Sequence, residues 1–156
     1  MNNVLFVGFK GKNNTSGLLA EQLSPNPLLL TNSFSGLRRD IDSICNEYDC
    51  FVMFGVDKTL SNSVRIDKIA SLNGIKKAST LNLQRLKENL AVKGVSAEIS
   101  EIPTAYLCNE AYWHVLDKFS GRAVFIHIPT IKHVNEGFVD RMKQAFQDGI
   151  WRALDI

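Results

Sequence analysis

Two residues in the second half of the chain have the types and surroundings needed for nucleophilic catalysis. Cys108 follows a Thr104-Ala-Tyr-Leu run with the signals of a helix start, and His127 lies two residues before Pro129, which ends an apolar strand. A helix N-terminus and a nearby imidazole both favour the thiolate, the reactive form of cysteine. The pattern therefore predicts a cysteine hydrolase with Cys108 as nucleophile and His127 as base.

Ordinary structural roles compete with this interpretation. A free cysteine is most often a small buried hydrophobe, although backbone N–H groups at a helix start can support both a thiolate and a developing oxyanion at Cys108. His127 lies between two isoleucines, so a buried histidine bonded to backbone is an equally good account of that stretch alone. Its place near the end of a strand, where ligands bind, favours the functional role.

The remaining cysteines and histidines are weaker candidates. Cys45 and Cys50 lie in a predicted apolar helix end and strand start, where we expect inert packing. His114 is six residues beyond Cys108, about 600° of helical rotation, and should point away from the thiol. His133 is expected in a surface loop.

Asp67 is the candidate carboxylate for orienting His127, because a third group normally fixes the tautomer of a catalytic imidazole. The competing interpretation is a solvated aspartate at a strand edge, flanked by Arg65 and Lys68. Composition alone favours the solvated aspartate.

The elements that must position these residues follow from short apolar runs and helical spacing. Strands are predicted over residues 4–9, 28–31, 50–55, 64–70, 95–102 and 123–128. Helices are predicted after Thr15 or Ser16, after Ser33 or Ser35 as far as Cys45, after Thr80, over 105–118 and over 136–154. The alternation predicts an α/β fold, a three-layer α/β/α sandwich with a mostly parallel central sheet. Asn73-Gly74 predicts a turn.

Composition narrows the classes of function. The 156 residues, 45% of them hydrophobic, suit one compact domain over residues 1–156. A net charge of +2 gives no electrostatic case for nucleic acid or a membrane surface, and no apolar run reaches the roughly 20 residues that span a bilayer. Three cysteines, an odd number, and an N-terminus without a leader predict a reducing, cytoplasmic setting.

Motifs of other enzyme classes are missing. The segment Gly8 to Asn13 has two residues between its glycines where a phosphate-binding Walker loop has four, and asparagine follows its lysine. The sequence contains no HExxH, paired CxxC or G-x-S-x-G pattern. We therefore predict no metal and no cofactor.

Several short motifs together resemble the pyroglutamyl peptidase (pyrrolidone-carboxylate peptidase) family. They are Leu107-Cys108-Asn109, the strand Phe125-Ile-His-Ile-Pro129, Asp67-Lys-Ile-Ala70 with Asp where the family has Glu, Ser79-Thr-Leu81, and the opening strand Val4 to Phe9. The resemblance implies the family's α/β/α fold, with Cys108 as nucleophile, His127 as general base and Asp67 as orienting acid. It also implies a homo-oligomer, a dimer or a tetramer.

The chain departs from the family at the positions that contact the pyroglutamate ring of the substrate. Phe9 remains, but a second phenylalanine is replaced by the Lys10 to Asn14 run, and Val56 stands in place of a glutamine. From these motifs, the residues expected to contact the substrate are Phe9, Asn14, Val56 and Leu107. Only seven residues lie between Ala70 and Ala78, where the family has a long loop. We also expect the shorter Asp67 to weaken the contact with His127.

Two hypotheses follow, with a third more distant. The first is a cysteine peptidase or amidase that cleaves an N-terminal pyroglutamyl group or a related small acyl amide. The second is a catalytically silent relative that binds a ligand or serves in assembly, because the residues that read the ring are lost. The third is a binder like the nucleoside phosphorylases, whose architecture is similar.

Overall fold

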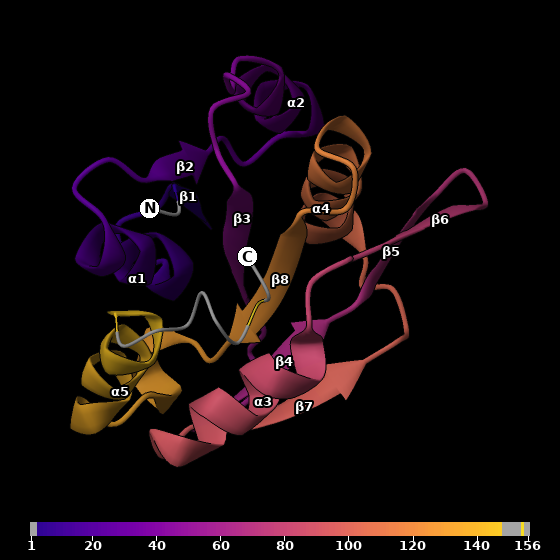
Figure 1. Ribbon diagram of the computed structural model, residues 1–156. Helices are drawn as coiled ribbons and strands as arrows, with labels where there is room; N and C mark the ends of the chain where they lie inside the picture. Colours follow the sequence, from indigo (N-terminus) through magenta and orange to yellow (C-terminus); the bar gives the residue numbers. More distant parts are fainter. Residues whose placement is uncertain (1–2, 148–153, 155–156) are drawn as a thin grey trace.

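The computed structural model describes residues 3–147 and Leu154, and shows helices packed on both sides of a twisted sheet (Figure 1). The strands are β1 Val4–Phe9, β2 Leu28–Leu30, β3 Cys50–Val56, β4 Ser63–Asp67, β5 Ile69–Leu72, β6 Ile75–Ala78, β7 Ser96–Ser100 and β8 Ala123–Ile128. The helices are α1 Thr15–Leu23, α2 Phe34–Asp42, α3 Leu83–Val92, α4 Tyr106–Lys118 and α5 Glu136–Gln147, with a short 3-10 helix, η1 Ile131–His133.

The central sheet has six strands in the order β2-β1-β3-β8-β4-β7. The first four run parallel, β4 is antiparallel to β8, and β7 is parallel to β4. The predicted α/β class with a mostly parallel sheet is confirmed. Because β4 and β7 run the other way, their carboxyl ends lie at the opposite edge from those of β3 and β8.

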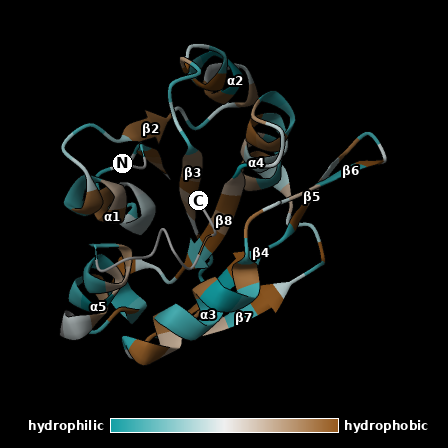
Figure 2. Cartoon of the chain, viewed as in Figure 1, coloured by the Kyte–Doolittle hydropathy of each residue, from teal (hydrophilic) through white to brown (hydrophobic). Residues whose placement is uncertain are grey.

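The two faces of the sheet carry separate hydrophobic cores, which makes the predicted three layers. Helices α1, α3 and α5 pack on one face through residues such as Leu19, Leu86 and Phe138. Helices α2 and α4 pack on the other through residues such as Leu37, Tyr112 and Val115. Strands β3 and β8 are apolar along almost their whole length, as expected of strands buried on both faces (Figure 2).

Strand β4 alternates, and its alternation matters for the site. Val64 and Ile66 enter the core beneath α1, α3 and α5, whereas Arg65 and Asp67 face the side of α4. The predicted strand over 64–70 is in fact two elements, because β4 ends at Asp67 and β5 begins at Ile69 in a separate two-stranded sheet. Polar residues are thereby placed on an inner face of the sheet.

The hairpin of β5 and β6 extends from the main sheet alongside α4 (Figure 1). Its turn residues Asn73 and Gly74 both have positive φ, 53° and 77°. Two left-handed residues are what a two-residue type I′ turn requires, so the turn predicted from Asn-Gly is confirmed. The short connection between Ala70 and Ala78 is therefore an ordered hairpin.

The N-cap residues of the helices were predicted less accurately than the presence of the helices. Ser33 caps α2 as predicted, but the caps of α1 and α3 are Asn14 and Asn82, and the alternatives Thr15, Ser16 and Thr80 were wrong. Asparagine and the hydroxyl residues share the ability to accept from the first free N–H groups, so composition does not separate neighbouring candidates.

One helix end differs from the prediction, and the predicted end of the last helix is not tested. Helix α2 ends at Asp42, so Ile44 and Cys45 lie beyond it. Helix α5 is described as far as Gln147, and the predicted continuation through Ile150 lies outside the described residues. In the described ranges no helix is long and apolar enough to cross a membrane, and Cys45, Cys50 and Cys108 are all free.

Phe146 joins α5 to the sheet through two edge-on aromatic contacts, 5.9 Å from Phe6 and 5.8 Å from Phe54 between ring centroids. We predict that Phe146→Leu lowers the free energy of unfolding by about 1–3 kcal/mol in urea titration, because both contacts and part of the packing are lost. Val92→Ala is the control: Val92 is 80% exposed, so its loss should stay within about 0.5 kcal/mol. Equal losses would contradict this description of the core.

Candidate active site

A cavity of about 350 Å³ opens where β3 and β8 end and α4 begins. Four predicted site residues line it: Val56, Leu107, Cys108 and His127. The other lining residues are Asp57, Lys58, Thr104, Ala105 and Tyr106. The position, beyond the carboxyl ends of parallel strands, is where α/β sheets bind ligands.

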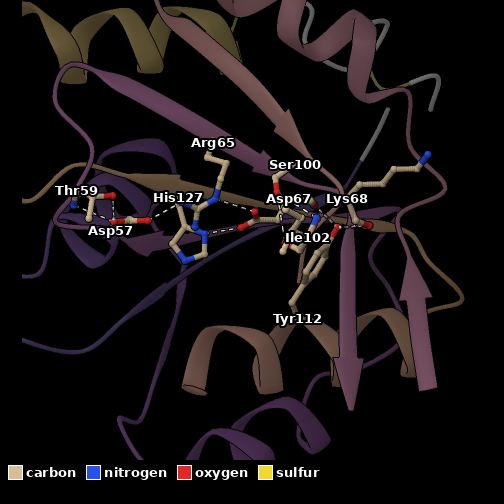
Figure 3. A network of polar contacts seen from close by, with 9 residues as sticks. All are labelled: Asp57, Thr59, Arg65, Asp67, Lys68, Ser100, Ile102, Tyr112 and His127. Atoms are coloured by element: carbon tan, nitrogen blue, oxygen red, sulfur yellow. Dashed lines mark hydrogen bonds and ion pairs between the residues drawn. The ribbon is translucent and has the colours of Figure 1, made fainter. Parts of the chain in front are cut away.

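The imidazole of His127 is held by the carboxylate of Asp67. Asp67 pairs with Phe125, two residues before His127, so the two side chains lie on the same face of the sheet. Asp67 Oδ2 lies 2.5 Å from His127 Nδ1, and the side chains are only 1% and 3% exposed (Figure 3). The interpretations of a solvated Asp67 and of a His127 bonded to backbone are wrong, and so is the expected weakening of the contact.

The shorter carboxylate reaches the imidazole because β4 is a direct neighbour of β8. An antiparallel pair brings diagonal residues on one face within reach of each other's side chains. With Nδ1 bonded to the carboxylate, Nε2 is the nitrogen left for exchange with a ligand. The ring also lies against Phe125, with centroids 4.8 Å apart, which further limits its rotation.

Cys108 lies in the first turn of α4, as predicted, with its sulfur above Gly55. A Cβ added to Gly55 would stand 2.8 Å from Cys108 Sγ and 2.7 Å from Phe125 Cε1, so only glycine leaves room for the thiol. Gly55 pairs in register with His127 on the neighbouring strand. Because Gly55 has no side chain, the sulfur of Cys108 fits above it, next to the residue of β8 that pairs with Gly55, which is His127.

The thiol of Cys108 is not a ready-made thiolate. Burial, followed by the negative charge of Asp67, raises its pKa to about 12, and Arg65 only partly opposes them. The preformed low-pKa thiolate expected from the helix start is therefore not supported. A nucleophile in this environment has to lose its proton as it attacks, which requires an adjacent base.

Side chains of α4 fix the helix against β4 and the hairpin. Tyr112, one helical turn after Cys108 and on the same face, donates from its hydroxyl to the backbone carbonyl of Asp67 at 2.7 Å. Asn109 makes two hydrogen bonds with the backbone of Ser71, accepting at 3.0 Å and donating at 2.7 Å. Trp113 Nε1 donates to the carbonyl of Ile75 at 2.9 Å. These bonds hold α4, which carries Cys108, in a fixed position relative to Asp67 and the hairpin.

Arg65 and Asp57 were not predicted as site residues. Arg65 Nε donates to Asp67 Oδ1 at 3.0 Å, and its Nη1 donates to Asp57 Oδ2 at 2.6 Å (Figure 3). Although burial acts to raise it, hydrogen bonds from Thr59 and Arg65 lower the pKa of Asp57 to about 2. The spacing of Arg65 and Asp67, two residues apart on an alternating strand, was the signal in the sequence.

Phe9 and Asn14 lie outside the lining of this cavity. Phe9 is 4% exposed in the core beneath α2 and α4. The Asn14 side chain caps α1, accepting from the backbone N–H of Ser16 at 3.0 Å. Both residues have structural roles here, and their predicted contact with substrate has no support from their positions.

The other cysteines and histidines lie outside the lining of the cavity that holds Cys108. Cys50 is buried in β3, where burial raises its pKa to about 12, but Cys45 is exposed, so its predicted packing in a helix end was wrong. His114 bonds to Glu110 at 3.1 Å, and His133 is exposed in η1. In the described part of the chain, no group of three His, Cys, Asp or Glu side chains could hold a metal.

No family model and no curated protein matches the sequence. Solved structures do match. Pyrrolidone carboxyl peptidase from Thermococcus litoralis aligns over 100% of this chain and 97% of its own, with a TM-score of 0.79 and 18% identity. A mutant pyrrolidone carboxyl peptidase from Pyrococcus furiosus aligns over 97% of this chain and 98% of its own, with a TM-score of 0.80 and 19% identity. Pyroglutamyl peptidase I from Bacillus amyloliquefaciens aligns over 100% of both chains, with a TM-score of 0.76 and 17% identity.

The chain has the fold of the pyrrolidone carboxyl peptidases. The resemblance predicted from short motifs is therefore confirmed at the level of fold. At 17–20% identity most side chains differ between the compared chains, so the activity has to be argued from the residues of the site.

Gly55→Ala tests the seating of the sulfur. We predict a loss of about 1–3 kcal/mol in the free energy of unfolding from overpacking, together with a changed labelling rate of Cys108 by iodoacetamide. Gly74→Ala is the control, because no atom lies within 4 Å of its added Cβ and only its positive φ of 77° carries a cost. An unchanged labelling rate in Gly55→Ala would show that the sulfur lies elsewhere.

Proposed function

We propose that this chain is a cysteine amidase or peptidase that cleaves an N-terminal pyroglutamyl group or a related small acyl amide. One observation carries the proposal. A half-buried thiol, Cys108, and an imidazole fixed by a buried carboxylate, His127 with Asp67, line the same cavity at a helix start. Nucleophile, base and orienting acid are the parts that acyl transfer requires.

Acylation proceeds by general base catalysis. His127 Nε2 takes the proton from Cys108 as the sulfur attacks the carbonyl carbon of the amide. The imidazolium that forms is stabilised by Asp67, and it then gives its proton to the departing amine as the C–N bond breaks. The acyl group remains on Cys108 as a thioester.

The start of α4 supplies charge stabilisation. Ala105, the N-cap residue, makes no side-chain cap hydrogen bond, and the first N–H groups of a helix lack partners within it. Because Ala105, Tyr106 and Leu107 all line the cavity, these N–H groups border the space in which an oxyanion would form. In the second half-reaction, His127 activates water, the C–S bond breaks, and the acid and the thiol are released.

The cavity suits a small acyl group. Its volume of about 350 Å³ is near the lower end for ligand sites, and Val56 and Leu107 give it apolar walls. Because Val56 offers no hydrogen bond to a lactam, we expect weaker selection for the pyroglutamyl ring than for compact apolar acyl groups. The scheme uses no metal or cofactor.

We also propose a cytoplasmic location and a homo-oligomer, a dimer or a tetramer. The three free cysteines fit a reducing compartment. Both statements remain predictions, and light scattering of the purified protein measures the second.

Hydrolysis of a panel of small acyl p-nitroanilides, pyroglutamyl included, tests the proposed activity. We expect turnover of at least one member, and a loss of roughly a thousandfold or more in kcat/KM in Cys108→Ser and in His127→Ala. Cys45→Ser is the control and should retain activity, because Cys45 is exposed and outside the cavity. No turnover of any amide would favour the catalytically silent relative.

Labelling with iodoacetamide tests the general base scheme separately. Since a raised pKa leaves little thiolate at neutral pH, the labelling rate of Cys108 should keep rising above pH 9. In His127→Ala the labelling profile should change little while turnover is lost. A labelling pKa well below about 8.5 that His127→Ala removes would instead indicate a preformed ion pair.

A further inference from the structure

We infer that Arg65, held by Asp57, is a positioning residue that sets the protonation of the Asp67–His127 pair. The inference rests on the proposed function for its catalytic meaning, but the protonation of the pair can be measured without any substrate. The observation behind it is a chain of contacts from the loop after β3 to the imidazole: Thr59 to Asp57, Asp57 to Arg65, Arg65 to Asp67, and Asp67 to His127 (Figure 3).

The geometry divides the two oxygens of Asp67 between two donors. Oδ1 accepts from Arg65 Nε at 3.0 Å, and Oδ2 bonds to His127 Nδ1 at 2.5 Å. With Oδ1 occupied by a guanidinium, the carboxylate cannot rotate to present its other oxygen to the ring without breaking an ion pair. Arg65 thereby fixes the orientation of the group that orients the base.

Charge gives Arg65 a second effect. The Asp67 side chain is 1% exposed, and burial in general disfavours the charged form of a carboxylate unless a cation lies beside it. The guanidinium of Arg65 favours the ionised carboxylate even when His127 is neutral. Asp67 is then acceptor-only, and it can receive Nδ1–H and leave Nε2 free as a base.

Asp57 keeps Arg65 in place. Its Oδ2 bonds to Arg65 Nη1 at 2.6 Å, and its Oδ1 accepts from the backbone N–H and the hydroxyl of Thr59 at 2.8 Å and 2.6 Å. Both oxygens of Asp57 are thus engaged, and the guanidinium has one direction of approach to Asp67. Because Asp57 lines the cavity, its carboxylate also places a negative charge near His127.

The groups that face the pair come from three elements. Besides Arg65 on β4, Asp57 and Lys58 lie after β3. Helix α4 contributes Cys108 to the cavity and Tyr112, whose hydroxyl bonds to the Asp67 carbonyl. Both α4 groups are neutral at pH 7, because burial followed by the charge of Asp67 raises the pKa of each. The nearby charges that can shift the pair are therefore those of Arg65, Asp57 and Lys58.

The two charged residues that connect Thr59 to Asp67, Arg65 and Asp57, have opposite expected effects. Removing the positive charge of Arg65 stabilises the protonated pair, so its titration midpoint should rise. Removing the negative charge of Asp57 destabilises the protonated pair, so the midpoint should fall. Loss of packing alone gives no reason for shifts of opposite sign.

The test is an NMR titration of the His127 ring in the full chain, in the variants Arg65→Gln, Arg65→Lys and Asp57→Asn. We expect the midpoint to rise by about one pH unit in Arg65→Gln and to fall by a few tenths of a unit in Asp57→Asn. Arg65→Lys, which keeps the charge, should return the midpoint most of the way to that of the wild type. Lys68→Gln is the control: its ion pair with Glu101 is solvent-exposed, and it should leave the midpoint unchanged.

Equal midpoints in wild type and Arg65→Gln would overturn the inference, and so would shifts of the same sign in Arg65→Gln and Asp57→Asn. If Arg65→Gln does not fold, the expected fall in Asp57→Asn and near-normal midpoint in Arg65→Lys decide the matter. The expected midpoints without turnover of any amide would uphold this inference and reject the proposed activity. Turnover with unmoved midpoints would do the reverse.

Discussion

The site depends on a carboxylate buried inside the sheet. Asp67 can be almost fully buried because Arg65, His127 and their hydrogen bonds replace the water it loses. This requires a strand that presents Arg65 and Asp67 on one face next to β8, which β4 does by pairing antiparallel to it. The reversed direction of β4 in an otherwise parallel neighbourhood is therefore a condition for placing an acid beneath the imidazole.

Cys108 belongs to a different layer, the helix layer of α4, and has to be brought to the same cavity as His127. Helix α4 packs on the sheet through its buried face, and Tyr112 and Asn109 tie it to Asp67 and to the hairpin by hydrogen bonds. Gly55 then leaves the space that the sulfur occupies. Burial of Cys108 also raises the pKa of its thiol, so the proposed reaction needs a base that takes the proton during attack.

Most strands and helices could be predicted because apolar runs and helical spacing report local structure directly. Cys108, His127 and Asp67 were chosen from residue types and short motifs, and the structure brings the Asp67 carboxylate to His127 and lines one cavity with Cys108 and His127. The caps at Asn14 and Asn82 were missed because several neighbouring residues can accept the same hydrogen bonds. The spacing of Arg65 and Asp67 showed that they share one face of a strand, but their link to His127 depends on β4 lying beside β8, which that spacing does not reveal. Phe9 and Asn14, chosen by position in a motif, turned out to serve the core and a helix cap. The raised pKa of Cys108 depends on its burial and on the charge of Asp67, which a helix-start signal cannot reveal.

In the proposed reaction, Cys108 carries the acyl group. The most direct measurement is mass spectrometry of acid-quenched protein during single turnover of an acyl amide that the chain hydrolyses. We expect a transient mass increase equal to the acyl group, located on the peptide that contains Cys108, and no such increase in Cys108→Ser. Hydrolysis that proceeds in Cys108→Ser, or an adduct located on another residue, would contradict it.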